Sequence, residues 1–313
     1  MRSRKVIVFG ATGEIGGRIA SGCVKAGHQV VGVSRGANKR EIVDLAGVRM
    51  IHGDKGDEKF VKESLAPLDY DAVIYSVAGL SDLKICAAHL RKAENVFICS
   101  STGTFVPLVN LPADESHPWR EKTTINGPWF PQCERDAFGL ALWSKEKFPL
   151  GVFRPTNIIG PGRIPLDLWG GRDIEFFRKL KKSEPVAVPM AENVLVQSGY
   201  NADLADAFVK ALDYPDKVRG EIFIISCKKA ITLGTYLRTA MKFLNSKSEI
   251  RMVSTDELKR IYPGYNWGGL DFLMTHMCFD IGKAERTFGY KPTRTGEQGL
   301  IEALEWCESS NIL

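Results

Sequence analysis

The feature that most constrains the fold of this chain is a glycine-rich turn near its N-terminus. The segment Lys5–Phe9 is apolar after its first residue, and the turn Gly10-Ala-Thr-Gly13-Glu-Ile-Gly16 follows it directly. The next stretch, Glu14–Ala26, carries apolar residues at helical spacing on one face. This order of an apolar run, a glycine turn and an amphipathic stretch predicts a strand, a tight turn and a helix.

Each glycine of this turn has a predicted role. Gly10 permits the tight turn, Gly13 lets the backbone approach a pyrophosphate without an intervening Cβ, and Gly16 allows the helix to pack closely on the strand. The helix N-terminus offers N–H groups and the positive end of its dipole to phosphates. The alternative is a tight turn that holds no ligand. We predict that a dinucleotide pyrophosphate is bound at Gly10, Thr12, Gly13, Glu14, Ile15 and Gly16.

Further apolar runs predict an α/β fold. Helical stretches separate most of them, a pattern typical of a parallel sheet that is covered on both faces. Right-handed crossovers then give a Rossmann-type, doubly wound sheet. The runs that follow the first strand are Gln29–Val33, Val48–Ile51, Ala72–Ser76, Asn95–Cys99, Leu150–Phe153 and Ile222–Ser226.

The pattern changes after Arg154, where residues 155–190 become rich in glycine and proline. We therefore expect two parts. Residues 1–163 with about 195–228 form the dinucleotide-binding Rossmann domain. Residues from about 164 to 194 with 229–313 form a smaller, discontinuous substrate-side lobe.

The end of the second predicted strand bears on which dinucleotide is bound. NAD-specific units place an acid there for the ribose 2′-hydroxyl, whereas this chain has Ser34 and Arg35, with Lys39 and Arg40 close behind. A hydroxyl and a guanidinium suit a 2′-phosphate and favour NADP over NAD. Arg35 as a solvated loop charge is the alternative. Asp54, after the third strand, is predicted to reach the adenine amine or to form a turn.

Composition restricts the other possibilities. The chain of 313 residues has a net charge of +5, which fits an anionic ligand and does not by itself indicate nucleic acid. Its seven cysteines are odd in number and contain no CxxC pair, so we expect neither disulfides nor a metal. No apolar run is long enough for a membrane span and the N-terminus runs straight into a strand, so we expect a cytoplasmic protein.

Several motifs together resemble the extended short-chain dehydrogenase/reductases of the NAD-dependent epimerase/dehydratase family. The resemblance extends over nearly the whole chain, and it also assigns Ala78 and Pro155 to the cofactor site. The Ser34–Gly36 turn and the stretch at Asn126 resemble less typical members, including those related to chloroplast stem-loop RNA-binding proteins. Beyond the glycine turn, the motifs are Phe97-Ile-Cys-Ser-Ser-Thr102, Phe153-Arg-Pro155, Gly160-Pro-Gly162, Tyr200-Asn-Ala-Asp203-Leu-Ala-Asp206 and Asp280 to Pro292.

In members of this family a Tyr-x-x-x-Lys pair assists hydride exchange. The resemblance places the two positions of that pair at residues that are Asn126 and Phe130 in this chain. No tyrosine occurs between residues 100 and 150. An asparagine amide can orient a substrate, but it cannot act as a general acid near neutral pH. Thr102 is expected where the family has its catalytic hydroxyl, or else caps local backbone. The catalytic candidates are therefore Thr102 and Asn126.

Three functions remain open at this point. The first is a diverged oxidoreductase or epimerase-type enzyme that binds NADP(H) or NAD(H) and acts on an unidentified small molecule. The second is a non-redox cyclase or isomerase on the same fold. The third is a non-catalytic scaffold that responds to the dinucleotide, or an RNA-binding protein. For the first, substitute proton donors are Tyr75, Asp114, Glu115, His117, Arg120, Glu121 and Tyr200.

The basic run Arg178–Lys182 is the strongest indication of nucleic acid, although a solvated basic helix face explains it without RNA. The resemblance suggests instead that Arg163, Arg172 and Lys179 meet a nucleotide diphosphate, and that two copies pair through a helical face. The aromatic stretch Tyr262–Gly269 is expected either as a lid over an apolar substrate or as a packed loop.

Overall fold

A computed structural model describes residues 2–36, 42–120 and 130–313 of the chain. Its centre is a seven-stranded parallel sheet with the order β11-β6-β5-β4-β1-β2-β3. This order confirms the doubly wound α/β fold. Later strands are added on both sides of β1, and the order therefore reverses at a switch point between β1 and β4. The strands are β1 (Lys5–Phe9), β2 (Gln29–Ser34), β3 (Val48–His52), β4 (Ala72–Tyr75), β5 (Asn95–Cys99), β6 (Leu150–Pro155) and β11 (Ile222–Ile225).

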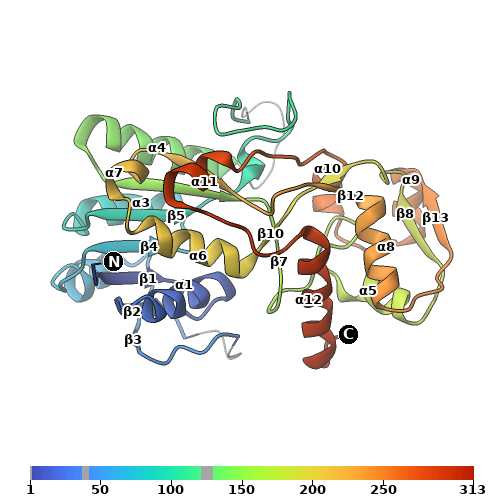
Figure 1. The fold of residues 1–313 in the computed structure, drawn as a ribbon, viewed down its shortest axis with the longest axis horizontal. Coiled ribbons are helices and arrows are strands. Elements are labelled where there is room, and N and C mark those ends of the chain that lie inside the picture. The colour runs from blue at the N-terminus through green and yellow to red at the C-terminus, as the bar shows by residue number, and fades with distance from the viewer. Residues whose placement is uncertain (1, 37–41, 121–129) are drawn as a thin grey trace.

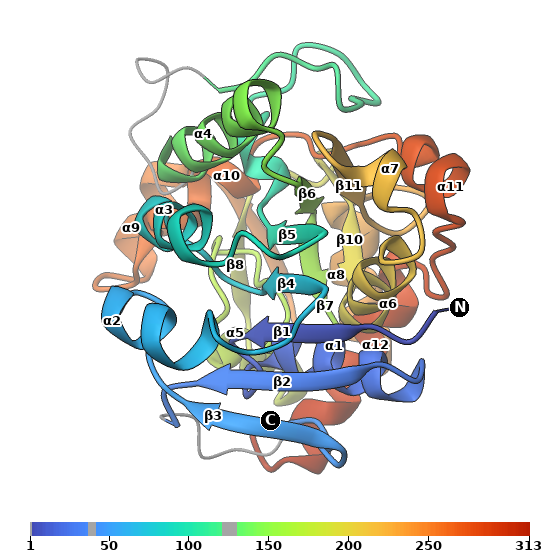
Figure 2. The ribbon, with the colours of Figure 1, turned by 90° about the vertical axis from the view of Figure 1, so that its left-hand side faces the viewer.

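The central strands are apolar because helices cover both faces of the sheet (Figure 2). Helices α1 (Glu14–Lys25) and α6 (Asn201–Ala211) pack on one face, where the ring of Phe153 stacks on that of Phe208. Helices α3 (Leu80–His89) and α4 (Phe130–Glu146) cover the other face. Shorter elements complete this part: α2 (Glu58–Phe60), the π-helix η1 (Val61–Leu65), the 3-10 helix η2 (Thr102–Thr104), α7 (Pro215–Val218) and α11 (Gly282–Phe288).

A smaller lobe lies beyond the carboxyl ends of the strands (Figure 1). It contains two small sheets: β8 (Val186–Pro189) pairs in parallel with β13 (Ile250–Val253), and β9 (Leu195–Val196) pairs antiparallel with β12 (Ile231–Thr232). A third pair, β7 (Asn157–Ile159) and β10 (Ser198–Tyr200), lies where the chain passes between the two parts. The lobe's helices are α5 (Ile174–Lys181), α8 (Leu233–Phe243), α9 (Thr255–Ile261), η3 (Trp267–Gly269), α10 (Leu270–Leu273) and α12 (Gly296–Ser309).

The basic run on α5 is engaged by the end of the chain. Arg178 donates to the carbonyl oxygen of Ile312 at 2.7 Å, and Lys181 donates to that of Leu313 at 3.0 Å. Lys181 also pairs with Glu308, and Lys179 pairs with Glu184. These contacts favour the interpretation of the run as an ordinary basic helix face that fixes α12. Within the described residues, no helix is both long and apolar enough to cross a membrane.

The aromatic stretch at residues 262–269 packs inside the smaller lobe. Tyr262 lies 4.4 Å from Trp169 between ring centres, and its hydroxyl accepts a hydrogen bond from the Ala187 amide. The hydroxyl of Tyr265 donates to Asp167 at 2.8 Å. Both tyrosines are thus held by contacts of their own, which favours a packed loop over a lid.

Candidate functional site

A groove opens at the carboxyl ends of the central strands, at the switch point between β1 and β4. It consists of two adjoining cavities, which we call the outer and the inner cavity, of about 420 and 560 Å³. They share Gly13, Ser76 and Val77 as lining residues. A ligand that extends across the ends of several strands is the kind that such a groove accommodates.

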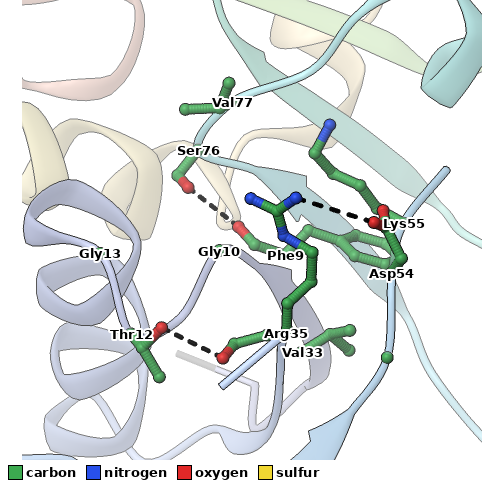
Figure 3. Close-up of a pocket in the computed structure, with 12 residues that line it drawn as sticks. Phe9, Gly10, Thr12, Gly13, Val33, Arg35, Asp54, Lys55, Ser76 and Val77 are labelled. Carbon is green, nitrogen blue, oxygen red and sulfur yellow. Dashed lines mark hydrogen bonds and ion pairs between the residues drawn. The ribbon is translucent and has the colours of Figure 1, made fainter. Parts of the chain in front are cut away.

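Every predicted cofactor residue lines this groove. The outer cavity, shown in Figure 3, and the inner cavity meet at the glycine turn. Four residues named in the sequence analysis lie outside the described residues: the catalytic candidate Asn126, the basic residues Lys39 and Arg40, and the candidate proton donor Glu121. Of the predicted residues, the outer cavity is lined by Gly10, Thr12, Gly13, Ser34, Arg35 and Asp54. The inner cavity is lined by Gly13, Glu14, Ile15, Gly16, Ala78, Thr102 and Pro155.

The glycine turn has the geometry that its sequence predicts. Gly10 adopts a φ of +78°, and a Cβ there would lie 2.4 Å from the Ser76 hydroxyl. A Cβ on Gly16 would lie 2.1 Å from the carbonyl oxygen of Gly10, so only glycine allows the helix to sit so close. Gly13 caps α1 without a side-chain hydrogen bond. The first N–H groups of the helix are therefore left for a phosphate ligand, and the turn fits a dinucleotide.

The outer cavity carries positive charge at its far end. Arg35 is 72% exposed in its side chain, and its Nη1 lies 3.9 Å from an oxygen of Asp54. In Figure 3 the Arg35 side chain extends toward Asp54 and Lys55. The Ser34 hydroxyl lies 3.1 Å from that of Thr12 and accepts the Gly36 amide at 3.0 Å. Lys55, which the sequence analysis missed, pairs with the buried Asp82.

Thr102 lies on the wall of the inner cavity. Its side chain is buried, and its hydroxyl donates to the carbonyl oxygen of Pro155 at 3.3 Å. This contact favours the local backbone role over the catalytic one. Phe130 is the first residue of α4, the helix on which the resemblance places the lysine of the pair.

The substitute proton donors among the described residues do not line either cavity. Tyr75 is buried against Phe9 on the α3 side of the sheet, and burial raises its pKa well above its usual range. Tyr200 donates to Glu302 on α12, and burial raises its pKa to about 12. Since neither tyrosine lines the groove, neither is placed to deliver a proton to a ligand there.

Three of the candidate proton donors between β5 and α4 accept hydrogen bonds from other groups of the protein. A Glu115 carboxylate oxygen accepts the Ile224 amide at 2.8 Å, and His117 Nε2 accepts the Val109 amide at 2.9 Å. Asp114 accepts both the amide and the hydroxyl of Ser116. These contacts account for the residue types without catalysis.

A buried ion cluster lies beneath the inner cavity. Asp136 is fully buried and accepts hydrogen bonds from Arg135 at 2.6 Å, from Arg154 at 3.0 Å and from the Ser100 hydroxyl at 2.6 Å. Arg135 also donates to the carbonyl oxygen of Ala78 at 2.7 Å. The cluster ties α4 to β6 and to the segments after β4 and β5, and so fixes the cavity wall.

The guanidinium of Arg154 packs against two aromatic rings, 4.0 Å from the ring centre of Trp119 and 4.5 Å from that of Phe105. Burial lowers its pKa, while Asp136 opposes that shift. Sequence reasoning missed this cluster, although an arginine inside the apolar run of β6 is a signal, since a buried arginine requires partners.

The sequence of the chain is similar to those of several known proteins. A family model described as the NmrA-like family matches residues 2–105. The chain is 27% identical to the chloroplast stem-loop binding protein of 41 kDa b from Arabidopsis thaliana, over 96% of this chain and 78% of that protein. It is 22% identical to UDP-glucuronate 4-epimerase 1 of the same plant, over 96% of this chain and 76% of that protein.

Solved structures share the fold. A dTDP-glucose 4,6-dehydratase from Bacillus anthracis in complex with NAD has a TM-score of 0.78 at 16% identity, over 99% of this chain and 98% of that one. A UDP-glucose 4-epimerase from Bifidobacterium longum in complex with NAD+ and UDP has a TM-score of 0.75 at 17% identity, over 98% and 99%. Both proteins hold NAD in structures with this fold.

The buried ion cluster predicts a large loss of stability on removal of its acid. The substitution Asp136→Ala leaves two buried guanidinium groups without a carboxylate, which costs about 3–5 kcal/mol of unfolding free energy. Urea unfolding measures this loss. The control Asp206→Ala breaks the exposed Asp206–Lys210 pair on α6 and costs about 0.5 kcal/mol or less. Equal losses in the two variants would contradict this account of the cluster.

Glu115 and its neighbour Asp114 predict opposite pH effects. Burial raises the pKa of Glu115 in the folded protein. The free energy of unfolding of the protein therefore falls as the pH rises through that pKa. Glu115→Gln should therefore raise the free energy of unfolding at pH 7, with the gain fading toward pH about 4. Hydrogen bonds from Ser116 lower the pKa of Asp114, so Asp114→Asn should lower stability at pH 7. Denaturant unfolding at several pH values tests both signs.

Proposed function

The chain belongs to the extended short-chain dehydrogenase/reductase family, with its NmrA-like and NAD-dependent epimerase/dehydratase members, and on this basis we propose that it is a dinucleotide-binding protein. It binds NADP(H) in preference to NAD(H) along the groove. The dinucleotide acts as a bound ligand, and the described lining of the inner cavity holds no Tyr–Lys pair to assist hydride transfer. In this proposal the protein responds to the dinucleotide bound in the groove.

One observation carries this proposal: the described lining of the inner cavity contains no tyrosine, lysine, histidine or aspartate. Of its titratable groups, Glu14 is bound to Arg163 and Arg135 to Asp136, while Arg172 donates to neutral oxygens. Burial raises the pKa of the Cys99 thiol to about 12. A nicotinamide bound there could supply or accept hydride, but the described wall offers no group that exchanges a proton near pH 7.

The preference for NADP rests on the outer cavity. Arg35 and the Ser34 hydroxyl lie at the end of β2, where the 2′-position of an adenosine ribose is expected. Lys55, which pairs with the buried Asp82, adds a second cationic side chain to the lining of this cavity. A carboxylate oxygen of Asp54 lies 3.9 Å from the Arg35 guanidinium, a separation that leaves the guanidinium able to turn to a phosphate.

A second candidate function is binding of structured RNA. The observation that favours it is the similarity to a chloroplast stem-loop binding protein over 96% of this chain. The net charge of +5 is compatible with it. Filter binding of a stem-loop RNA across a salt series decides, because phosphate contacts make the affinity fall with salt. Binding that is undetectable near physiological salt would remove this candidate.

Titration of the purified protein tests the proposal itself. NADPH should bind, as followed by its fluorescence, and should then survive incubation with a panel of aldehydes and ketones without oxidation. The proposal would be refuted if none of NADPH, NADP+, NADH and NAD+ bound to the protein. Rapid oxidation of bound NADPH by a carbonyl compound would replace it with the diverged oxidoreductase of the sequence analysis.

Arg35 is predicted to set the cofactor preference. Arg35→Ala should weaken NADPH binding about tenfold or more and leave NADH binding nearly unchanged, because a charge-assisted hydrogen bond to phosphate is lost. Calorimetric titration of both ligands measures the ratio. The control Arg49→Ala removes an arginine that is exposed on β3 and does not line the groove. An equal loss for NADPH and NADH in Arg35→Ala would contradict the assignment.

A further inference from the structure

The first residue of α1 places a carboxylate beside the expected pyrophosphate. Glu14 follows Gly13 at the helix N-terminus and lines the inner cavity. Its side chain is only 8% exposed. A fixed negative charge at this point interacts favourably with the positive end of the helix dipole. It also repels a pyrophosphate that binds to the same N–H groups. The proposed function therefore requires something that cancels this charge.

Arg163 supplies the cancelling charge from the segment that follows β7. Its Nε donates to one oxygen of Glu14 at 2.6 Å, and the side-chain amide of Asn201 donates to the other at 2.6 Å. The Arg163 side chain is 33% exposed and lines the inner cavity. Its Nη1 and Nη2 make no hydrogen bond within the described residues, so four N–H donors remain for a ligand.

The same contacts attach the approach to the smaller lobe to the glycine turn. Arg18, on the next turn of α1, donates to the carbonyl oxygen of Pro161 at 2.7 Å, and Asn201 donates to it at 2.8 Å. A Cβ on Gly162 would lie 3.2 Å from Cγ of Glu14. Residues 160–163 are thus seated on the first turns of α1, and Arg163 reaches the groove from there.

Building on the proposed function, we propose that Arg163 binds the dinucleotide pyrophosphate. Glu14 is its positioning residue: it holds Nε, fixes the plane of the guanidinium and leaves the Nη groups for phosphate oxygens. A bidentate guanidinium is well suited to this contact. Since Arg163 leads into the smaller lobe, bound dinucleotide ties that lobe to the Rossmann sheet through Glu14, Arg163 and the phosphates.

A purely structural staple between Glu14 and Arg163 predicts a different outcome from a ligand contact. In a staple, loss of either partner lowers stability without a specific effect on dinucleotide affinity. In the proposed arrangement, removal of Arg163 both deletes a phosphate contact and exposes the phosphates to the uncompensated charge of Glu14. Neutralising Glu14 in that background should then restore part of the affinity.

A double-mutant cycle with Arg163→Gln, Glu14→Gln and the double variant tests this. Arg163→Gln should weaken NADPH binding about 10- to 100-fold, the range for a charged hydrogen bond. The double variant should bind NADPH severalfold tighter than Arg163→Gln alone. Adenosine 2′-phosphate, which lacks the pyrophosphate, should bind all variants equally.

Arg18→Gln is the matched control, because it loses a contact to the same segment from outside the cavities. It should lower the melting temperature as Arg163→Gln does and leave the affinity for NADPH unchanged. An NADPH affinity of Arg163→Gln within about twofold of wild type, or a double variant no tighter than Arg163→Gln, would overturn the inference alone. Absence of NADPH binding in the wild-type protein would overturn the proposed function and this inference together.

Discussion

The site depends on one close approach, that of α1 to the strand before it. The carbonyl oxygen of Gly10 occupies the space that a side chain at Gly16 would need, with only 2.1 Å to a hypothetical Cβ. This contact lets the helix begin directly at the switch point of the sheet. Helix α6 then packs on α1, and Asn201 at its start reaches Glu14. The groove, the helix N-terminus that lines it and the path into the smaller lobe all follow from the position of that helix.

The charges of the groove are distributed to suit an anionic ligand. The inner cavity is lined by Arg135, Arg163 and Arg172, while Glu14 is the only carboxylate in its described lining. The acids that do occur nearby are already bound to cations or to backbone amides. Such a wall can hold phosphates and orient a ligand, but it offers little for proton exchange. Binding of a dinucleotide and catalysis are therefore separate questions for this chain.

The fold could be predicted from the sequence because its signals are local. Apolar runs such as Val6–Phe9 and Ala72–Tyr75 are buried on both faces, and the glycine turn follows its strand without a break. Most residues that line the groove could be predicted for the same reason, since strand ends converge at one edge of a parallel sheet.

Other features depend on contacts between residues far apart in the chain. The cluster of Asp136 with Arg154 and the pair of Glu14 with Arg163 join segments that no local pattern connects. The substitute proton donors could not be ranked from sequence either. Glu115 is near the expected site along the chain, yet it accepts a hydrogen bond from β11 and does not line the groove. Residue type and chain position did not reveal which groups were already bonded.

The most direct test of the account is a crystal structure of the protein with NADPH. The account predicts the pyrophosphate at the N–H groups that follow Gly13, within hydrogen-bonding distance of Arg163, and the 2′-phosphate beside Arg35. The nicotinamide should then lie in the inner cavity, with no tyrosine or lysine of the described lining at its reactive carbon. Density for the dinucleotide outside the groove, or a lysine and a tyrosine closing over the nicotinamide, would contradict the central claim.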